Sequence, residues 1–244
     1  MKKTTIIQIV LFTILSASCS VAQEGALKFN NPLERAQKTT SFGAMYCLPV
    51  GDFGSTNLEK GGFARAGWGL YFDSKSTFKN GLTFISHSTY AWVPLDQNAV
   101  AEAFTANLGR KTEVTGGKHK PFLSTIGIGY DFKPAPFLTI GVSAQGGILY
   151  NSFKGFDMTV YDSTGTSILF SDNFKYDAEF SLAYVFGAKF NFSLIKDVLS
   201  FQVTVDYSGS KYQSYLRSYH LEPIKTSQNI QILNIGGGFA FHTN

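Results

Sequence analysis

Cysteine, histidine and long apolar runs are scarce in this sequence, and each shortage excludes a class of protein. The 244 residues include two cysteines and four histidines. If an export signal is removed after Ala22, Cys47 is the only cysteine left, so no intrachain disulfide can form. The histidines are scattered without the spacing of metal ligands, so we predict no metal site and no cofactor.

Strong charge is also missing. The formal net charge is +4, and no cluster of Lys and Arg forms a stripe along the chain, so we expect no nucleic-acid partner. Beyond the N-terminus, no apolar stretch is long and uninterrupted enough for a membrane helix. Any membrane span must therefore consist of strands.

The N-terminus has the pattern of an export signal. Lys2 and Lys3 precede the apolar run from Ile6 to Leu15, and small residues follow. Cleavage after Ala22 would leave Gln23 at the new N-terminus. The alternative is a lipid-bearing Cys19, for which Ser16 is a poor match because a branched apolar residue is favoured there. We predict a signal peptide over 1–22, a periplasmic leader over 23–39 and one domain over 40–244.

What the sequence does contain favours strands. It has 23 Phe, 12 Tyr and 24 Gly, residues typical of strands and tight turns. Runs with a period of two predict eight strands, and the connections between them alternate between long and short. The long polar segments are 93–119, 151–177 and 209–226. This pattern predicts an all-β fold, an eight-stranded antiparallel transmembrane β-barrel with short periplasmic turns and long outer loops.

The faces of the strands indicate a membrane location. In 178–192, Phe180, Phe186 and Phe190 share one face, and Glu179 and Lys189 share the other. Eight strands enclose a lumen that side chains can just fill, so large aromatic residues from every strand would not fit inside. We expect them to face lipid, with interface girdles formed by Tyr46, Trp68, Phe72, Trp92, Tyr130, Phe132, Tyr207 and Phe241.

The last strand carries a second indication. Asn234, Gly236, Phe239 and Phe241 resemble the C-terminal targeting signal of bacterial outer-membrane barrels, although His242-Thr243-Asn244 follow the last aromatic residue. This resemblance implies the cell outer membrane as the location. It also implies outer-membrane lipid and the barrel assembly machinery as partners.

The first strand adds a family resemblance. Gly43 to Leu48, followed by Pro49-Val50-Gly51-Asp52-Phe53, resembles the first strand and loop of small porin-like outer-membrane β-barrel proteins. These proteins are common in Gram-negative bacteria of the Bacteroides group. The resemblance implies the fold and the location, and the family offers no catalytic motif to transfer.

Ionisable residues on the inner face are the candidate site. We expect a lumen charge network formed by Arg65, Asp73, His87, Asp131, Glu179, Lys189 and Asp206. Buried charges are retained mainly when they are paired, which favours a structural network. The functional alternative is a pathway lined by water and ions.

No catalytic arrangement stands out. Neighbouring strand residues point to opposite faces, so His87 cannot activate Ser88. We therefore predict a non-enzymatic barrel with a structural, adhesive or interaction role through its outer loops. A narrow channel for ions or small solutes is the alternative, and a lipid-modifying enzyme is a third possibility. Asp96 to Leu108 reads as a short helix over the barrel mouth, with Asp96 as its cap and Gly109 at its end.

Overall fold

The computed structural model describes residues 35–58, 61–218, 222 and 224–243. The expected signal peptide at 1–22, Cys19 and most of the expected leader lie outside these residues. Strand β1 begins at Arg35, inside the range expected for the leader. The sheet therefore starts before residue 40, where the sequence period of two becomes clear.

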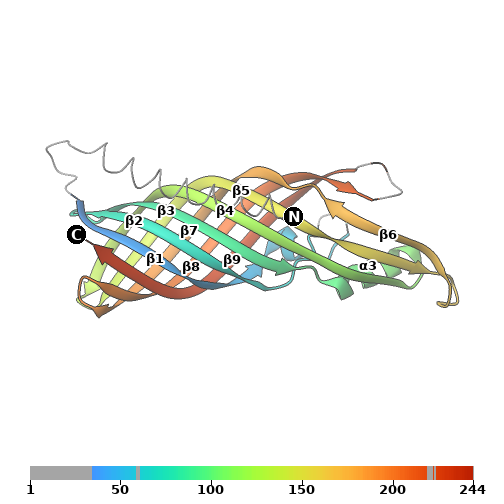
Figure 1. Ribbon diagram of the computed structural model, residues 1–244, viewed down its shortest axis with the longest axis horizontal. Coiled ribbons are helices and arrows are strands. Elements are labelled where there is room, and N and C mark those ends of the chain that lie inside the picture. Colours follow the sequence, from blue (N-terminus) through green and yellow to red (C-terminus); the bar gives the residue numbers. More distant parts are fainter. Residues whose placement is uncertain (1–34, 59–60, 219–221, 223, 244) are drawn as a thin grey trace, which may run out of the picture. The chain divides into compact units, whose positions relative to one another are not determined.

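Strands make up most of the described chain (Figure 1). They are β1 (Arg35–Pro49), β2 (Gly67–Phe78), β3 (Leu82–Pro94), β4 (Thr112–Ala135), β5 (Leu138–Tyr161), β6 (Ile168–Tyr176), β7 (Glu179–Ile195), β8 (Leu199–Arg217) and β9 (Ile224–Thr243). Two short helices complete the described part of the fold, α2 (Gly51–Gly54) and α3 (Gln97–Leu108).

The strands close into an antiparallel ring of eight positions, which confirms the predicted fold class. Each strand from β1 to β5 pairs with the next, and β7, β8 and β9 continue the ring until β9 pairs with β1. Strands β6 and β7 share one position, because both pair with β5 and only residues 177–178 separate them. Closure leaves the wall without an unpaired edge.

The break between β6 and β7 is held in place by β8. The hydroxyl of Tyr212 donates a hydrogen bond to the carbonyl oxygen of Asp177. Arg217 donates from Nε to both carboxylate oxygens of Asp177, at 2.9 and 2.8 Å. The wall therefore keeps its eighth position although its strand is interrupted.

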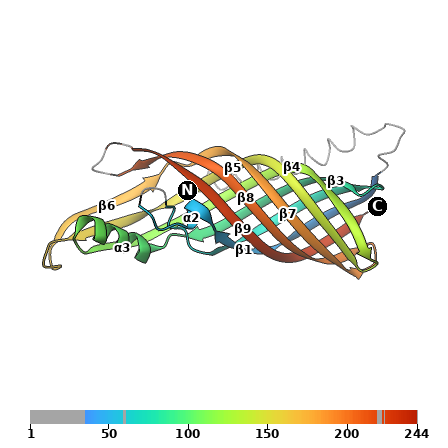
Figure 2. The same cartoon turned by 180° about the vertical axis from the view of Figure 1, so that it is seen from behind.

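The connections at one end of the barrel are short, as predicted. They span 79–81, 136–137 and 196–198. At the other end, the expected long loops 93–119 and 151–177 consist mostly of helix and strand. Strands β4 and β5 are 24 residues long each, and with β6 they continue beyond the barrel as a small sheet (Figures 1 and 2). The third segment, 209–226, is also largely strand, because β8 runs to Arg217.

Helix α3 confirms the predicted helix, but it packs on this extension rather than over the barrel mouth (Figure 2). The Asp96 side chain accepts from the backbone N–H of Ala99 at 3.1 Å, and Gly109 ends the helix with a φ of 64°. This φ suits glycine, because side chains rarely adopt it. The buried core between α3 and the sheet contains Phe63, Leu95, Val100, Val114, Phe153, Phe156, Met158, Val160, Phe174. The extension therefore has a core of its own.

The β5–β6 turn closes the extension at its tip. The carboxylate of Asp162 accepts from the Thr164 hydroxyl at 2.8 Å and from the backbone N–H of Thr166 at 3.0 Å. These hydrogen bonds lower the pKa of Asp162 to about 2, because they stabilise the ionised form. The turn is thus organised by one acidic side chain.

The outer wall of the barrel is apolar, as the alternation predicted. Leu182 on β7 has 84% of its surface exposed, and Phe186 has 57%. Other exposed apolar residues of the wall are Phe42, Tyr46, Trp68, Leu70, Phe84, Ile126, Ile128, Tyr130, Phe132, Val142, Phe180, Phe239, Phe241. No helix in the described part of the chain is long and apolar enough to cross a membrane.

Candidate functional site

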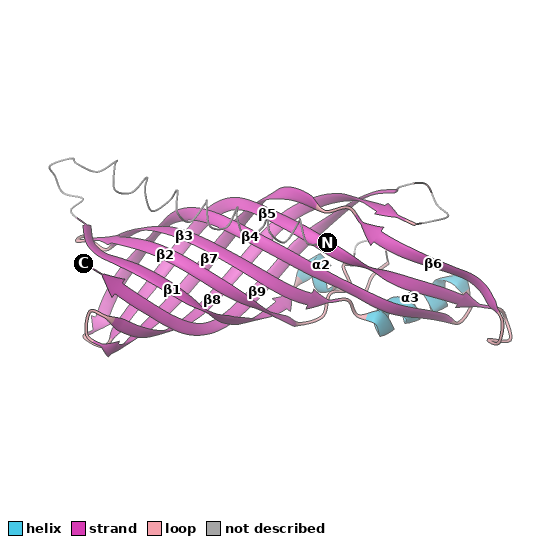
Figure 3. Ribbon diagram, in the orientation of Figure 1, coloured by secondary structure: helices cyan, strands magenta, loops and turns pink. Residues whose placement is uncertain are grey.

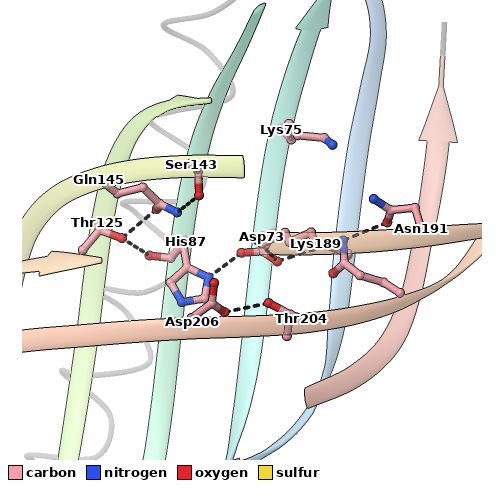
Figure 4. Close-up of polar contacts among 12 residues, drawn as sticks. Asp73, Lys75, His87, Thr125, Ser143, Gln145, Lys189, Asn191, Thr204 and Asp206 are labelled. Carbon is pink, nitrogen blue, oxygen red and sulfur yellow. Dashed lines mark hydrogen bonds and ion pairs between the residues drawn. The ribbon is translucent and has the colours of Figure 1, made fainter. Parts of the chain in front are cut away.

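The centre of the lumen is a carboxylate with three donors. Ser41, Asp73 and His87 are paired in register on β1, β2 and β3, so their inward side chains lie at one level. Lys189 reaches the same carboxylate from β7, with its Nζ 2.6 Å from Asp73 Oδ2. His87 Nδ1 lies 2.5 Å from Oδ1 (Figure 4). The Ser41 hydroxyl donates to Oδ2 at 3.2 Å.

This cluster ties opposite walls of the barrel together. Strands β1, β2 and β3 are neighbours in the sheet, while three strands separate β2 from β7 in either direction around the ring. Asp73, His87 and Lys189 are all buried. Burial weakens solvent screening and makes an unpaired charge costly, so the pairing of Asp73 with Lys189 holds the lumen closed at this level.

A second ion pair lies closer to the short turns. Lys75 Nζ is 2.6 Å from Asp131 Oδ2, and both side chains are almost fully buried. Thr77 adds a hydrogen bond to the same oxygen at 3.3 Å. The pair lines a vestibule of about 650 Å³ that also includes His242 and Lys133. Most side chains that line the vestibule are therefore polar.

Amides and hydroxyls fill the space around the ion pairs. Gln202 donates from Nε2 to Asn191 Oδ1 at 2.9 Å, and the Thr204 hydroxyl donates to Asp206 Oδ2 at 2.7 Å. Asp206 is also packed against Gly187, where an added Cβ would lie 2.0 Å from the Asp206 Oδ1 atom. Glycine at 187 thus makes room for a buried carboxylate.

The other half of the lumen, toward α2 and α3, is mostly apolar, although His119 and Asn151 are also buried there. Its buried core contains Met45, Cys47, Phe53, Ala91, Val93, Leu123, Leu149, Ala183, Val185, Ile230, Ile232. The buried Lys and Asp side chains described in the lumen belong instead to the turn-side half. We call these two parts the apolar half and the charged half.

The β1–β2 connection closes the apolar half from the mouth of the barrel. Phe53 of α2 is fully buried, and its ring meets His119 edge-on with centroids 5.0 Å apart. The backbone N–H of Val50 donates to the carbonyl oxygen of Gln231, and Asn229 donates to Asp52 Oδ2 at 2.8 Å. Helix α2 lies at the same end of the barrel as α3 (Figure 3), so Phe53 acts as a plug.

The structure brings together only part of the predicted network. Asp73, His87 and Lys189 are in direct contact, whereas Asp131 pairs with Lys75 instead. Glu179 begins β7 opposite Asn151 and is half-buried, at the far end of β7 from Lys189. The expectation for Arg65 is wrong, because this residue precedes β2 and its exposed side chain lies 3.9 Å from Asp96.

Two important residues were missed by the sequence reading. Lys75 follows Asp73 by two residues and therefore shares its face. The polar sequence after Asp73 conceals this signal, although β2 continues to Phe78. Phe53 has no such signal, because a single aromatic residue in a loop of irregular pattern does not reveal that the loop folds inward.

The residues of the predicted C-terminal pattern lie on both faces of β9. Asn234 is buried in the lumen opposite Asp206, while Phe239 and Phe241 are exposed on the wall. Phe241 stacks on Phe42 with ring centroids 5.9 Å apart. Recognition of these residues by an assembly machinery stays a prediction.

Comparison with solved structures gives weak likenesses to outer-membrane proteins. No protein-family model matches the sequence, and no curated protein matches it either. The outer membrane protein OprG from Pseudomonas aeruginosa is 13% identical with a TM-score of 0.48, over 85% of this chain and 96% of that chain. A major outer membrane protein from Thermus thermophilus is 12% identical with a TM-score of 0.46, over 85% of this chain and 100% of that chain.

Neisserial surface protein A is a further example. It is 11% identical with a TM-score of 0.42, over 84% of this chain and 98% of that chain. Structural similarity this weak does not assign a function to the residues of the lumen. The eight-stranded assignment rests on the strand pairing of this chain itself.

Proposed function

We propose that this protein is a small outer-membrane β-barrel that does not conduct and that works through its outer extension. The observation that carries the proposal is the double closure of the lumen. Ion pairs close the charged half, and packed apolar side chains with the Phe53 plug close the other. A solute would have to displace both.

The outer wall supports the membrane location. An apolar surface around a closed barrel is stable in lipid, because every backbone group of the wall is paired within the sheet. In water, an apolar surface of this extent would favour association. Barrels of this kind place short turns toward the periplasm and longer segments outside, so the extension of β4, β5, β6 and α3 is assigned to the outer side.

The extension is the surface assigned to structural, adhesive or other interaction roles. Its core packs α3 against the sheet, so it can present a rigid surface rather than a flexible loop. No catalytic role is included in the proposal. His87 is engaged with Asp73 inside the lumen, while the Ser88 hydroxyl is directed to Ser124 at 3.5 Å.

A narrow channel remains the second candidate, because the vestibule of about 650 Å³ offers ions a polar entrance. Single-channel recording of the refolded protein in planar bilayers separates the two functions. The non-conducting barrel should give at most small and infrequent steps. Steady, large conductance whose ion selectivity changes in Lys189→Gln would overturn the proposal and favour the channel.

A further inference from the structure

Three lysines gather on the outer wall where β4 and β5 leave the apolar belt. Lys118 and Lys120 alternate with buried His119 and Pro121 on β4, so their side chains point outward. Lys154 follows buried Phe153 on β5 and is exposed. We call these three residues the outer lysine cluster.

Their height above the belt follows from strand geometry. Phe122 and Tyr150 are paired on the outer face, and Lys120 and Lys118 lie two and four residues above Phe122. At about 3.3 Å per residue and a tilt of about 45°, this places them roughly 5 and 9 Å nearer the outside. The polar headgroup layer is about 5–8 Å thick on each side.

Aromatic residues mark the same boundary on the neighbouring strands. Trp68 and Trp92 stack with ring centroids 4.2 Å apart, and Tyr90 meets Trp92 edge-on at 4.5 Å. Trp and Tyr favour the membrane–water interface. The outer lysine cluster therefore lies within the headgroup layer and at its outer edge, immediately above surface that contacts acyl chains.

The charges of this cluster are not balanced within the described protein. Lys118 and Lys154 are directly opposite each other in the β4–β5 register, and like charges in that position are destabilising. No ion pair to any of the three occurs among the described residues. By contrast, Lys75, Lys189 and Lys111 each have a carboxylate within 2.8 Å.

We propose that the outer lysine cluster binds the phosphate group of a lipid in the outer leaflet. A phosphate would relieve the repulsion between Lys118 and Lys154, and Lys120 would add a third donor. The apolar wall directly below, with Phe122 and Tyr150, would hold the acyl chains of the same molecule. This favours an amphiphile over a free anion. The inference rests on the membrane location proposed above.

The two tryptophans give a local readout, because the chain has no others and they form the stacked pair at this boundary. The protein is refolded into phosphocholine vesicles that contain a spin-labelled lipid. The label is carried either by phosphatidic acid, which exposes a phosphate monoester, or by phosphatidylcholine. Trp quenching should be stronger with phosphatidic acid, and raised salt should weaken the preference.

The test variant replaces Lys118, Lys120 and Lys154 with glutamine. It should lose the preference for phosphatidic acid, by about fivefold in apparent affinity per lysine. Lys211→Gln is the matched control, since Lys211 is a single exposed lysine on β8, and it should keep the preference. Equal quenching by the two lipids in the unaltered protein, or an unchanged preference in the triple variant, would overturn the inference.

Two further results separate the sources of failure. Competition by inorganic phosphate at concentrations comparable with the lipid would identify a free-anion site and reject the lipid. Failure of the unaltered protein to insert into vesicles, judged by its gel mobility before and after boiling, would overturn the membrane location itself. Normal insertion without lipid preference would reject only the lysine site.

Discussion

The two halves of the lumen are closed by different physics. In the charged half, Asp73, His87 and Lys189 connect opposite walls through directed contacts. In the apolar half, side chains such as Val93 and Val185 are packed without exposed surface. The first closure depends on each partner being present, because removing one leaves a buried charge. The second depends on filled volume, and each residue contributes a share.

The difference shows that the lumen of such a barrel need not be polar along its whole length. A porin needs a wet interior, but a barrel of eight positions can be filled like the core of a soluble protein. Here only the turn-side half follows the polar pattern. The two closures lie in series, so weakening one leaves the other in place.

The largest effect is expected for Asp73→Ala. Loss of the carboxylate leaves Lys189 buried without its partner, which should lower the free energy of unfolding by roughly 3–5 kcal/mol. The change in unfolding free energy is measured by urea unfolding of the protein refolded in vesicles. Asp157→Ala on the extension, where the side chain is exposed and bonded to Asn173, is the control and should cost much less. A cost for Asp73→Ala no greater than the control would contradict the charged closure.

A second variant tests which surface is the outside. Phe186 is in the middle of the outward run on β7, so Phe186→Arg should cost about 2–4 kcal/mol near the bilayer midplane. Leu194→Arg is the matched control, because Leu194 is on the same strand and both side chains have 57% exposure. Leu194 lies near the turn, where the cost should be about 0–1 kcal/mol. Equal costs would argue against a lipid-facing wall.

A smaller effect is expected for a change of polarity in the apolar half. Val185→Thr keeps the size of the side chain but buries a hydroxyl, so it should cost about 1–3 kcal/mol. Val205→Thr, at a half-buried position on the outer face of β8, is the comparison. If Val185→Thr were neutral by urea unfolding, the apolar half would have to be hydrated.

The mildest test concerns access to the apolar half. Cys47 is fully buried and free, so in a Cys19→Ser background a water-soluble maleimide should label the native protein very slowly. Phe53→Ala removes the plug above it and should speed labelling. The reaction is followed by the mass of the labelled protein. Fast labelling with Phe53 in place would mean that the plug does not seal the lumen.

The sequence predicted the wall better than the interior. Alternation along 178–192 identified the outward aromatic residues, because lipid on one side and a narrow lumen on the other impose a strict period of two. Pairing in the lumen depends on which strands face each other across the ring, and Lys189 meets Asp73 from a strand far along the chain. Alternation along one strand does not indicate which residue of another strand lies across the lumen.

The structure of the outer segments was even harder to predict from the sequence. Polar composition at 151–177 suggested a loop, but these residues pair along β5 and β6. Apolar residues such as Phe156 and Phe174, whose stacked rings are 5.3 Å apart, are buried in the core that α3 covers. The local sequence does not indicate that a helix from another segment covers them. Helix α3 itself was predictable, since its cap at Asp96 and its stop at Gly109 are local signals.

The continuity of β4 and β5 from the short turn to the tip has a mechanical consequence. These two strands share one register with no shift between Thr112 and Phe132, so their pairing continues from the wall into the extension. A pull on the extension away from the cell would act along the strands and load their many hydrogen bonds in shear, all at once. We expect the extension to resist such a force as part of the barrel rather than peel away from it.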